Sequence, residues 1–290
     1  MHRILSSQFP VLSSQTVTAC LFQYHLSKEG VFTENRELAT ENWLMTRRRW
    51  IADEVNGNTA ALVGEHAAHL ARVLRAEVGQ EFDIATGAEV RLGKITSISD
   101  DRVEFALGKG QPPKPFPQII LALAIFKFDR MEWAIEKCTE IGVARIIPVI
   151  ARRSDAHLAA AAVKRHERWQ RLVRQASEQS RRPAPPEIAG PVKLKDLAGV
   201  LPPVALTRVV LAESLAESEE DTRLADILQS SSQSQPTEVA LAVGPEGGWT
   251  DEELAWFREA GWIAASLGST ILRAETAAIV ATALALETLR

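Results

Sequence analysis

The sequence predicts an α/β fold, with a C-terminal domain built on a mostly parallel sheet and a small β-barrel before it. Short strand-like runs fill residues 47–110, whereas beyond residue 118 apolar runs alternate with helical segments. Between them, GKGQPPKPFPQ (108–118) holds four prolines and marks the clearest boundary in the chain. We therefore expect a poorly ordered extension at 1–44, a barrel at 45–110, a proline-rich linker at 111–118 and an α/β domain at 119–290.

Composition points to a soluble protein with a sizeable core. The chain has 290 residues, of which 46% are hydrophobic and 24% charged. No apolar run approaches the roughly 18 residues that span a bilayer, and the N-terminus lacks the continuous apolar block of a signal peptide. Cys20 and Cys138 lie far apart without a disulfide or metal-binding pattern, which favours a reducing, cytoplasmic location and no bound metal.

Charge is unevenly distributed along the chain. The net charge of −4 argues against a polyanionic partner, but residues 151–182 contain nine Lys and Arg against three Asp and Glu. Residues 191–290 reverse the balance, with seven basic and fifteen acidic residues. The basic block falls on one expected helix, so nucleic acid binding stays open.

The first 44 residues show no sustained periodicity and are rich in Ser and Thr. Met45 is followed at once by TRRRWI. Two interpretations stay open: a poorly ordered extension of the protein, or a segment upstream of a natural start at Met45. Neither gives this segment a function.

The barrel is expected from strand-like runs separated by turn residues. A short helix in GEHAAHLARVLRAEVGQ (64–80) interrupts them, with His66 and His69 three residues apart. Because no third ligand accompanies the two histidines, we expect a half-exposed pair rather than a metal site. The strand-like runs are RRWIADEV, TAALV, EFDIA, EVRLGKITSIS and RVEFALG.

The C-terminal domain is expected from apolar runs that suit strands buried on both faces. Helices are expected at 129–142, at roughly 160–181 and at 275–289, with a surface helix in the acidic segment before residue 233. The first strand, helix and second strand form a βαβ unit of some thirty residues. The strand runs are 119–126, 145–150, 209–212, 239–243 and 263–267.

Ligands of parallel α/β sheets bind beyond the carboxyl ends of the strands, where this sequence places KFDR (127–130), GPEGGWT (244–250) and GSTILRAET (268–276). The glycine spacing in GPEGGWT fits neither a dinucleotide fingerprint nor a P-loop. Thr250 and Glu253 predict a capping box at the helix that follows. Taken alone, this loop is equally a tight turn or a surface that lets a ligand approach the main chain.

The third loop shifts that balance toward a ligand. It opens with Gly268 and carries Arg273 and Glu275 at the mouth of a helix that is almost entirely apolar. A buried ion pair or helix cap is the alternative for these two residues. Two glycine-bearing loops at one sheet edge favour a pocket for a nucleoside-like ligand.

Two motifs closely resemble the paired C-terminal motifs of the RsmE family: AVGPEGGWTDEE and LGSTILRAETA. The resemblance extends in order over RRRW, HLARVLR, KFDRMEWAIEKCTEIGV, RRS and RWQRLVRQASEQSRR, and covers about residues 47–290. Members of this family are 16S ribosomal RNA (uracil-N3) methyltransferases of the SPOUT class. The resemblance implies a PUA-like barrel, a C-terminal trefoil knot, an S-adenosylmethionine site and an obligate homodimer. Neither periodicity nor composition indicates the knot.

The chemistry of uracil-N3 methylation suggests roles for two residues. Arg273 is the candidate to stabilise the uracil anion, because a guanidinium stays charged and donates two aligned bonds, and Glu275 would orient Arg273 or take the proton. The family pattern implies the donor site. The loops would bind S-adenosylmethionine through Val243, Gly244, Gly248, Leu267, Gly268, Ile271 and Leu272. The family often has Pro-Arg where this chain has Ser269-Thr270, which puts target recognition by that loop in doubt.

RNA contact is expected from basic residues outside the loops. Helical spacing places four of them on one stripe, and further arginines precede this helix or the barrel. A solvated helix face is the alternative. The expected RNA-binding residues are Arg47, Arg48, Arg152, Arg153, Lys164, Arg168, Arg171 and Arg182.

Two other functions compete with uracil-N3 methylation. One is a SPOUT enzyme that methylates the ribose 2′-hydroxyl, and the other is a non-catalytic RNA-binding module. The intact glycines, Arg273 and Glu275 argue against the second.

Overall fold

The computed structural model describes residues 49–111, 117–202, 206–212, 222–232 and 238–289. The expectations for residues 1–44, for Arg47 and Arg48 and for most of the linker therefore lie outside the described residues. None of the helices in the described ranges is long and apolar enough to cross a membrane.

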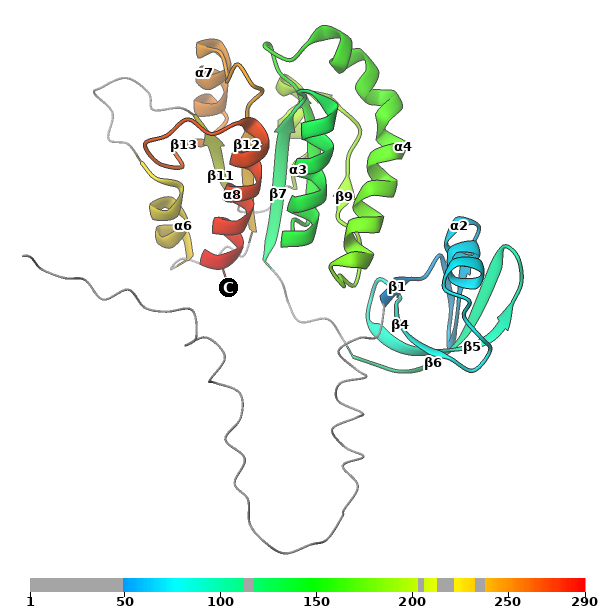
Figure 1. Cartoon of the computed structure of the whole chain (residues 1–290). Helices are drawn as coiled ribbons and strands as arrows, with labels where there is room; N and C mark the ends of the chain where they lie inside the picture. The colour runs from blue at the N-terminus through cyan, green and yellow to red at the C-terminus, as the bar shows by residue number, and fades with distance from the viewer. Residues whose placement is uncertain (1–48, 112–116, 203–205, 213–221, 233–237, 290) are drawn as a thin grey trace, which may run out of the picture. The chain divides into compact units, whose positions relative to one another are not determined.

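The first strands form a curled, six-stranded mixed sheet, a half-barrel with β1 and β2 at its two edges (Figure 1). β1 pairs with β4 in parallel, and the other pairings are antiparallel. This matches the expected series of short strands, but the sheet order leaves β1 and β2 unpaired with each other. The strands are β1 Arg49–Ile51, β2 Glu54–Asn56, β3 Thr59–Val63, β4 Glu81–Ala85, β5 Val90–Ile98 and β6 Arg102–Gln111.

A short helical segment packs on the half-barrel, as the sequence predicts. It consists of α2 (Glu65–Ala68) and a π-turn, η1 (His69–Val73), and it buries Leu70 in the half-barrel core. His66 Nδ1 lies 3.5 Å from Asp53 Oδ2. Burial raises the pKa of Asp53, but hydrogen bonds from His66 and a backbone N–H, with the charge of Arg174, hold that pKa below its usual value.

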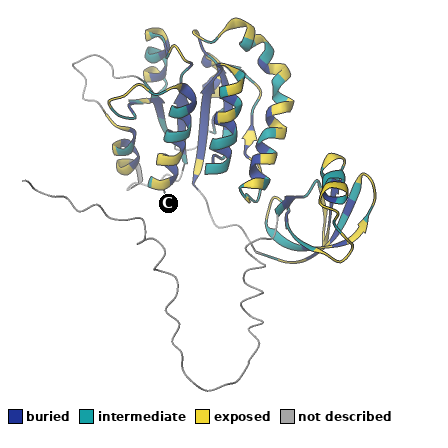
Figure 2. Cartoon of the chain, in the orientation of Figure 1, coloured by how far each residue is buried: buried dark blue, intermediate teal, exposed yellow. Residues whose placement is uncertain are grey.

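The second sheet is seven-stranded and wholly parallel, in the order β10-β8-β7-β12-β11-β13 with β9 also paired to β8. β7 and β12 lie at its centre and are buried along almost their whole length, because their continuous apolar runs suit a strand covered on both faces (Figure 2). The strands are β7 Gln118–Ala124, β8 Arg145–Ile150, β9 Glu187–Ile188, β10 Val192–Lys193, β11 Thr207–Leu211, β12 Glu238–Val243 and β13 Ile263–Ala265.

Helices cover both faces of this sheet. Alternate residues of β7 point to opposite faces: Ile119, Leu121 and Leu123 to one core, Ile120 and Ala122 to the other. The first face carries α3 (Phe128–Ile141), α4 (Ala156–Gln179), α6 (Leu224–Ser232) and α8 (Ala274–Thr288), with α3, α4 and α8 in front of the sheet in Figure 1. The second carries η2 (Leu194–Asp196), α5 (Leu197–Val200) and α7 (Asp251–Glu259).

The predicted elements agree with the structure except in a few places. β9, β10, η2 and α5 were not expected, because segments of two to four residues show no periodicity. α4 ends at Gln179 rather than near residue 181, since Arg181 adopts a positive φ of 57°. The trefoil knot stays a prediction, because strand order does not establish how the chain is threaded.

Candidate functional site

Two loops leave the carboxyl ends of β12 and β13, the two strands that flank β11 in the parallel sheet. The glycine-rich loop (Gly244–Thr250) follows β12, and the final loop (Ser266–Arg273) follows β13. β7 and β8 end at the same edge, where Lys127–Arg130 and Ala151–Asp155 follow them. Because every strand of this sheet is parallel, the structure brings the expected ligand loops to one side of the fold.

The glycine-rich loop is a tight turn that runs into a capped helix. The N–H of Gly248 donates to the carbonyl of Pro245 at 2.8 Å, and Gly248 has a φ of 68°, which suits glycine. Thr250 and Glu253 form the predicted capping box at the start of α7. Glu253 also accepts a hydrogen bond from the N–H of Arg152 at 2.7 Å, which joins this turn to the loop after β8.

The final loop has few contacts of its own. Gly268 has a φ of 129°, and the residues after it project outward, with the Ile271 side chain 77% exposed. Leu267 and Leu272 are partly buried. From Leu267 to Leu272 no hydrogen bond joins this loop to the described residues. Leu267 packs against the hydrophobic core, whereas Ile271 is left exposed.

The expected catalytic residues occupy different environments. Arg273 is the N-cap residue of α8 and is exposed, and its side chain makes no hydrogen bond or ion pair within the described residues. Glu275 lies in the first turn of α8 with 7% of its side chain exposed, and its Oε2 has no hydrogen-bond partner there. The alternative prediction of an Arg273–Glu275 ion pair is therefore wrong.

Glu275 instead faces Arg130, which belongs to the expected sheet-edge loop KFDR but was not among the expected site residues. Arg130 Nε lies 3.8 Å from Glu275 Oε1, and Arg130 Nη1 lies 2.6 Å from Glu246 Oε1. Glu246 is the one charged residue of the glycine-rich loop, and Arg130 is one of the two basic residues of KFDR. This ion pair could have been predicted from the sequence, because one sheet-edge loop carries an acidic residue and another loop at the same edge carries a basic one.

Three of the basic residues expected to contact RNA, Arg153, Arg168 and Arg182, have partners within the protein. Arg153 Nη1 donates to the carbonyls of Gly247 at 2.6 Å and Trp249 at 3.1 Å. Arg168 Nε donates to both carboxylate oxygens of Glu132 at 2.9 and 3.0 Å. Both side chains stay exposed in part, so these contacts define their positions without removing them from the surface.

The expected place of Arg182 on the basic stripe is wrong. α4 ends before it, and its guanidinium donates to the carbonyl of Thr139 at 2.8 Å. Burial lowers the pKa of Arg182 to about 10. By contrast, Arg152, Lys164 and Arg171 are exposed and make no side-chain hydrogen bond or ion pair with any described residue.

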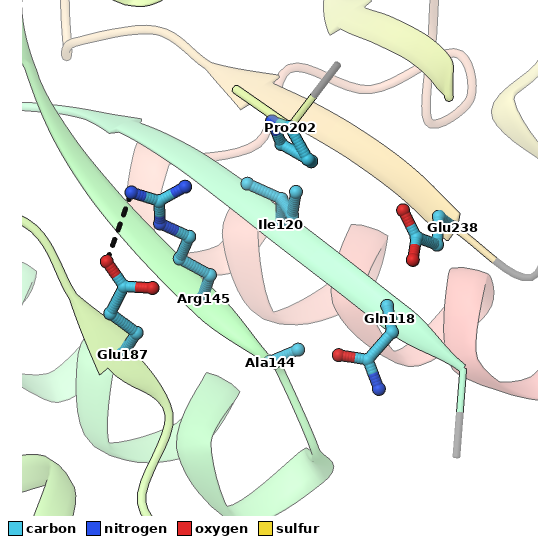
Figure 3. A pocket seen from close by; sticks show the side chains of 7 residues that line it. All are labelled: Gln118, Ile120, Ala144, Arg145, Glu187, Pro202 and Glu238. Carbon is cyan, nitrogen blue, oxygen red and sulfur yellow. Dashed lines mark ion pairs between the residues drawn. The ribbon is translucent and has the colours of Figure 1, made fainter. Parts of the chain in front are cut away.

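A hollow of about 270 Å³ lies at the opposite edge of the parallel sheet (Figure 3). Gln118, Arg145 and Glu238 line it where β7, β8 and β12 begin, and Arg145 pairs with Glu187 at 3.0 Å. Ligands of parallel α/β sheets bind at the carboxyl ends of the strands, so this hollow is not the candidate site.

The chain matches known proteins over most of its length. The RNA methyltransferase domain model matches residues 112–286. "Ribosomal RNA small subunit methyltransferase E" of Rickettsia conorii is 34% identical over 77% of this chain and 87% of its own length. The protein of the same name from Synechocystis is 30% identical over 86% of this chain and 80% of its own length.

A solved structure matches as well. Ribosomal RNA small subunit methyltransferase E from Neisseria gonorrhoeae, bound to S-adenosyl methionine, superposes with a TM-score of 0.70 at 29% identity. The match covers 82% of this chain and 95% of that one, and so includes both the half-barrel and the parallel sheet. The chain therefore belongs to the RNA methyltransferase family, and within it to the ribosomal RNA small subunit methyltransferase E family.

Proposed function

We propose that this chain transfers the methyl group of S-adenosylmethionine to N3 of a uridine in the 16S ribosomal RNA of the small subunit. The carrying observation is that the two loops with the family motifs leave the same carboxyl edge of one parallel sheet, on the two sides of β11. The Neisseria gonorrhoeae relative, whose structure holds S-adenosyl methionine, supports the donor. The names of the relatives support small-subunit ribosomal RNA as the substrate.

The residues of the two loops fit this donor. The glycine-rich loop offers main chain with little side-chain cover, and Leu267, Ile271 and Leu272 supply apolar surface for a purine. Ser266 Oγ and Glu275 Oε2 are buried without hydrogen-bond partners in the described structure, which leaves polar atoms for a ligand to satisfy. We propose Val243, Gly244, Gly248 and Gly268 as the main-chain part of the same site.

The reaction breaks the N3–H bond of uracil and the S–C bond of the donor, and forms the N–C bond, with the proton passing to a base. When bound, S-adenosylmethionine supplies an electrophilic methyl group on a sulfonium. Uracil N3 loses its proton and forms the N–C bond as the S–C bond breaks, which leaves S-adenosylhomocysteine. Arg273, exposed and without a protein partner, stabilises the charge on the uracil oxygens, because a guanidinium stays charged and donates two aligned hydrogen bonds.

Glu275 is the proposed proton acceptor or positioning carboxylate of this reaction. Its side chain is almost fully buried and faces Arg130 rather than Arg273. It therefore acts on the site through its free Oε2 or through Arg130, and does not orient Arg273 by direct contact.

RNA binding is assigned to the exposed cations and to the half-barrel. Arg152, Lys164 and Arg171 carry unpaired charges at the surface of the described residues and suit phosphate contacts. We propose residues 45–110 as the RNA-binding domain and 119–290 as the methyltransferase domain, joined by 111–118. Arg47 and Arg48 keep their proposed role in that domain.

A homodimer is the proposed assembly, and bacterial cytoplasm the proposed location. Within the described residues, Val280, Ala283 and Leu284 of α8 are partly or largely exposed, with Leu284 at 37%. Trp133 on the neighbouring α3 is 48% exposed. Apolar surface of this kind is typical of a subunit interface. Light scattering at micromolar concentration tests the dimer, and a monomer would refute it.

Nucleoside analysis of small-subunit RNA tests the proposed reaction. RNA from cells that lack the gene is incubated with purified protein and S-adenosylmethionine, then digested for mass spectrometry. We expect N3-methyluridine to be restored at one position. Appearance of a 2′-O-methylated nucleoside would favour the alternative enzyme, and no product with either free RNA or assembled subunits would exclude catalysis.

A further inference from the structure

Arg130 connects two parts of the candidate site that are far apart in the sequence. It lies in the first turn of α3, and its guanidinium faces Glu246 of the glycine-rich loop at 2.6 Å and Glu275 of α8 at 3.8 Å. One side chain therefore links the loop after β12 to the start of the helix after β13. The two carboxylates come from the two loops that bear the family motifs.

The charges explain why a cation is needed at this position. Glu275 is 7% exposed, and a buried carboxylate is costly unless an opposite charge or hydrogen bonds compensate it. Among the described residues, Arg130 is the cation within ion-pair distance of Glu275. Loss of Arg130 would leave Glu246 and Glu275 as neighbouring like charges, and their repulsion would favour movement of the exposed one, Glu246, with its loop.

Arg153 holds the same loop from the segment after β8, the strand on the other side of β7 from β12. Its Nη1 donates to the carbonyls of Gly247 and Trp249, which fixes the orientation of two peptide units in the turn. A Cβ atom on Gly247 would lie 3.3 Å from Arg153 Cδ, so the arginine stem packs closely on the bare main chain. Arg130 therefore fixes a side chain of the loop, and Arg153 fixes its backbone.

We propose that Arg130 and Arg153 are positioning residues that hold the glycine-rich loop in the shape that binds the methyl donor. This rests on the proposed function, because it deepens the role of that donor site. It assigns both arginines to the donor half of the reaction and gives Arg153 a role other than RNA contact. Two cations from one βαβ unit thus shape a loop that the sequence places about 100 residues later.

Calorimetric titration of S-adenosylmethionine into the full chain tests the proposal without RNA. We expect Arg130→Ala and Arg153→Ala each to raise the Kd at least about tenfold, since binding would have to order the loop. Arg130→Lys should recover part of the loss, because one ammonium can pair with only one of two separated carboxylates. At saturating donor, kcat should fall less than donor affinity.

Arg145→Ala is the matched control. Arg145 also pairs with a carboxylate, Glu187 at 3.0 Å, and donates to a carbonyl, Val200 at 2.7 Å, but it lies at the opposite edge of the same sheet (Figure 3). We expect its Kd for the donor to stay within about twofold of wild type. If removal of any paired arginine simply destabilised the protein, Arg130→Ala, Arg153→Ala and Arg145→Ala would all lose stability. Thermal melting of each variant distinguishes such a loss from a specific loss of donor affinity.

Glu246→Gln tests the proposal if Arg130→Ala does not fold. Its side chain is 40% exposed, so the change removes a charge without opening the core. We expect a several-fold weaker Kd. A donor Kd within twofold of wild type in folded Arg130 or Glu246 variants and in Arg153→Ala would overturn the proposal. A wild-type chain that binds no donor would instead refute the proposed function.

Discussion

The glycine-rich loop and the final loop share one sheet edge but are held in opposite ways. Glu253, Arg153 and Arg130 each bond to the glycine-rich loop or its helix cap. With the described residues, the final loop makes backbone hydrogen bonds at its two ends, Ser266 and Arg273. One loop is thus fixed by the protein, whereas the other leaves its side chains free to meet ligands.

This difference suggests that the two loops have different functions. A fixed turn presents main-chain groups at constant positions, which lowers the entropic cost of binding a donor. A loop with exposed Ile271 and Arg273 can close on a substrate and supply its charge when the target base arrives. Substitutions in the first should therefore change stability and donor affinity, and substitutions in the second should change catalysis.

Arg273→Ala is the strongest test of the free loop. We expect methyl transfer at saturating donor and RNA to fall by roughly 10²–10³-fold, the usual loss when one donor to a developing anion is removed. The melting temperature and the donor Kd should stay near wild type, because Arg273 is exposed and unpaired among the described residues. Single-turnover assays and calorimetry measure the two effects. Full activity in this variant would exclude the proposed role.

Glu253→Ala is the corresponding test of the fixed loop. The change removes the capping box and the acceptor for the Arg152 N–H, and we expect a loss of about 2 kcal/mol in unfolding free energy. Denaturant melts measure it, with Glu252→Ala as the control, since Glu252 is exposed on the same first turn. The unfolding free energy of Glu253→Gln should lie between those of Glu253→Ala and Glu252→Ala. If Glu253→Ala and Glu252→Ala were equally stable, Glu253 would not fix the glycine-rich loop, and the contrast between the two loops would fail.

Gly248→Ala tests the turn itself. Gly248 has a φ of 68° and a Cβ atom there would meet open space, so backbone strain alone should cost about 1 kcal/mol. The donor Kd of Gly248→Ala should also rise, because the strained turn would relax into a different conformation. Gly190→Ala is a suitable control, with open space and no unusual φ. A stability loss no greater than that of the control would show that this turn tolerates side chains.

Periodicity predicted the fold well where elements were long and apolar. β7, β12 and α8 each exceed five residues and bury continuous runs, so their positions follow from the sequence. The capping box at Thr250 followed from two residue types at a fixed spacing. The short β9 and β10 could not be predicted, because two residues carry no period and their pairing with β8 depends on tertiary contacts.

The site was harder to predict, because charge partners lie far apart in the chain. Arg130 and Glu246 are 116 residues apart, and Arg153 and Gly247 are 94 apart, so no local pattern links them. Arg182 was placed on an exposed stripe by extending a helical period past the true helix end. A basic residue count shows that RNA contact is possible, but it does not show which cations are already paired.

Ile271→Ala should have the smallest effect of these changes. It tests whether an exposed residue of the final loop contributes to donor binding without contributing to stability. Because Ile271 is 77% exposed, we expect the unfolding free energy to stay within about 0.5 kcal/mol of wild type. The donor Kd should rise by roughly three- to tenfold, as loss of apolar contact with a purine costs about 1 kcal/mol. Thr270→Ala, exposed in the same loop, is the control. If Ile271→Ala lowered stability and left the Kd unchanged, Ile271 would belong to the protein core rather than to the ligand surface.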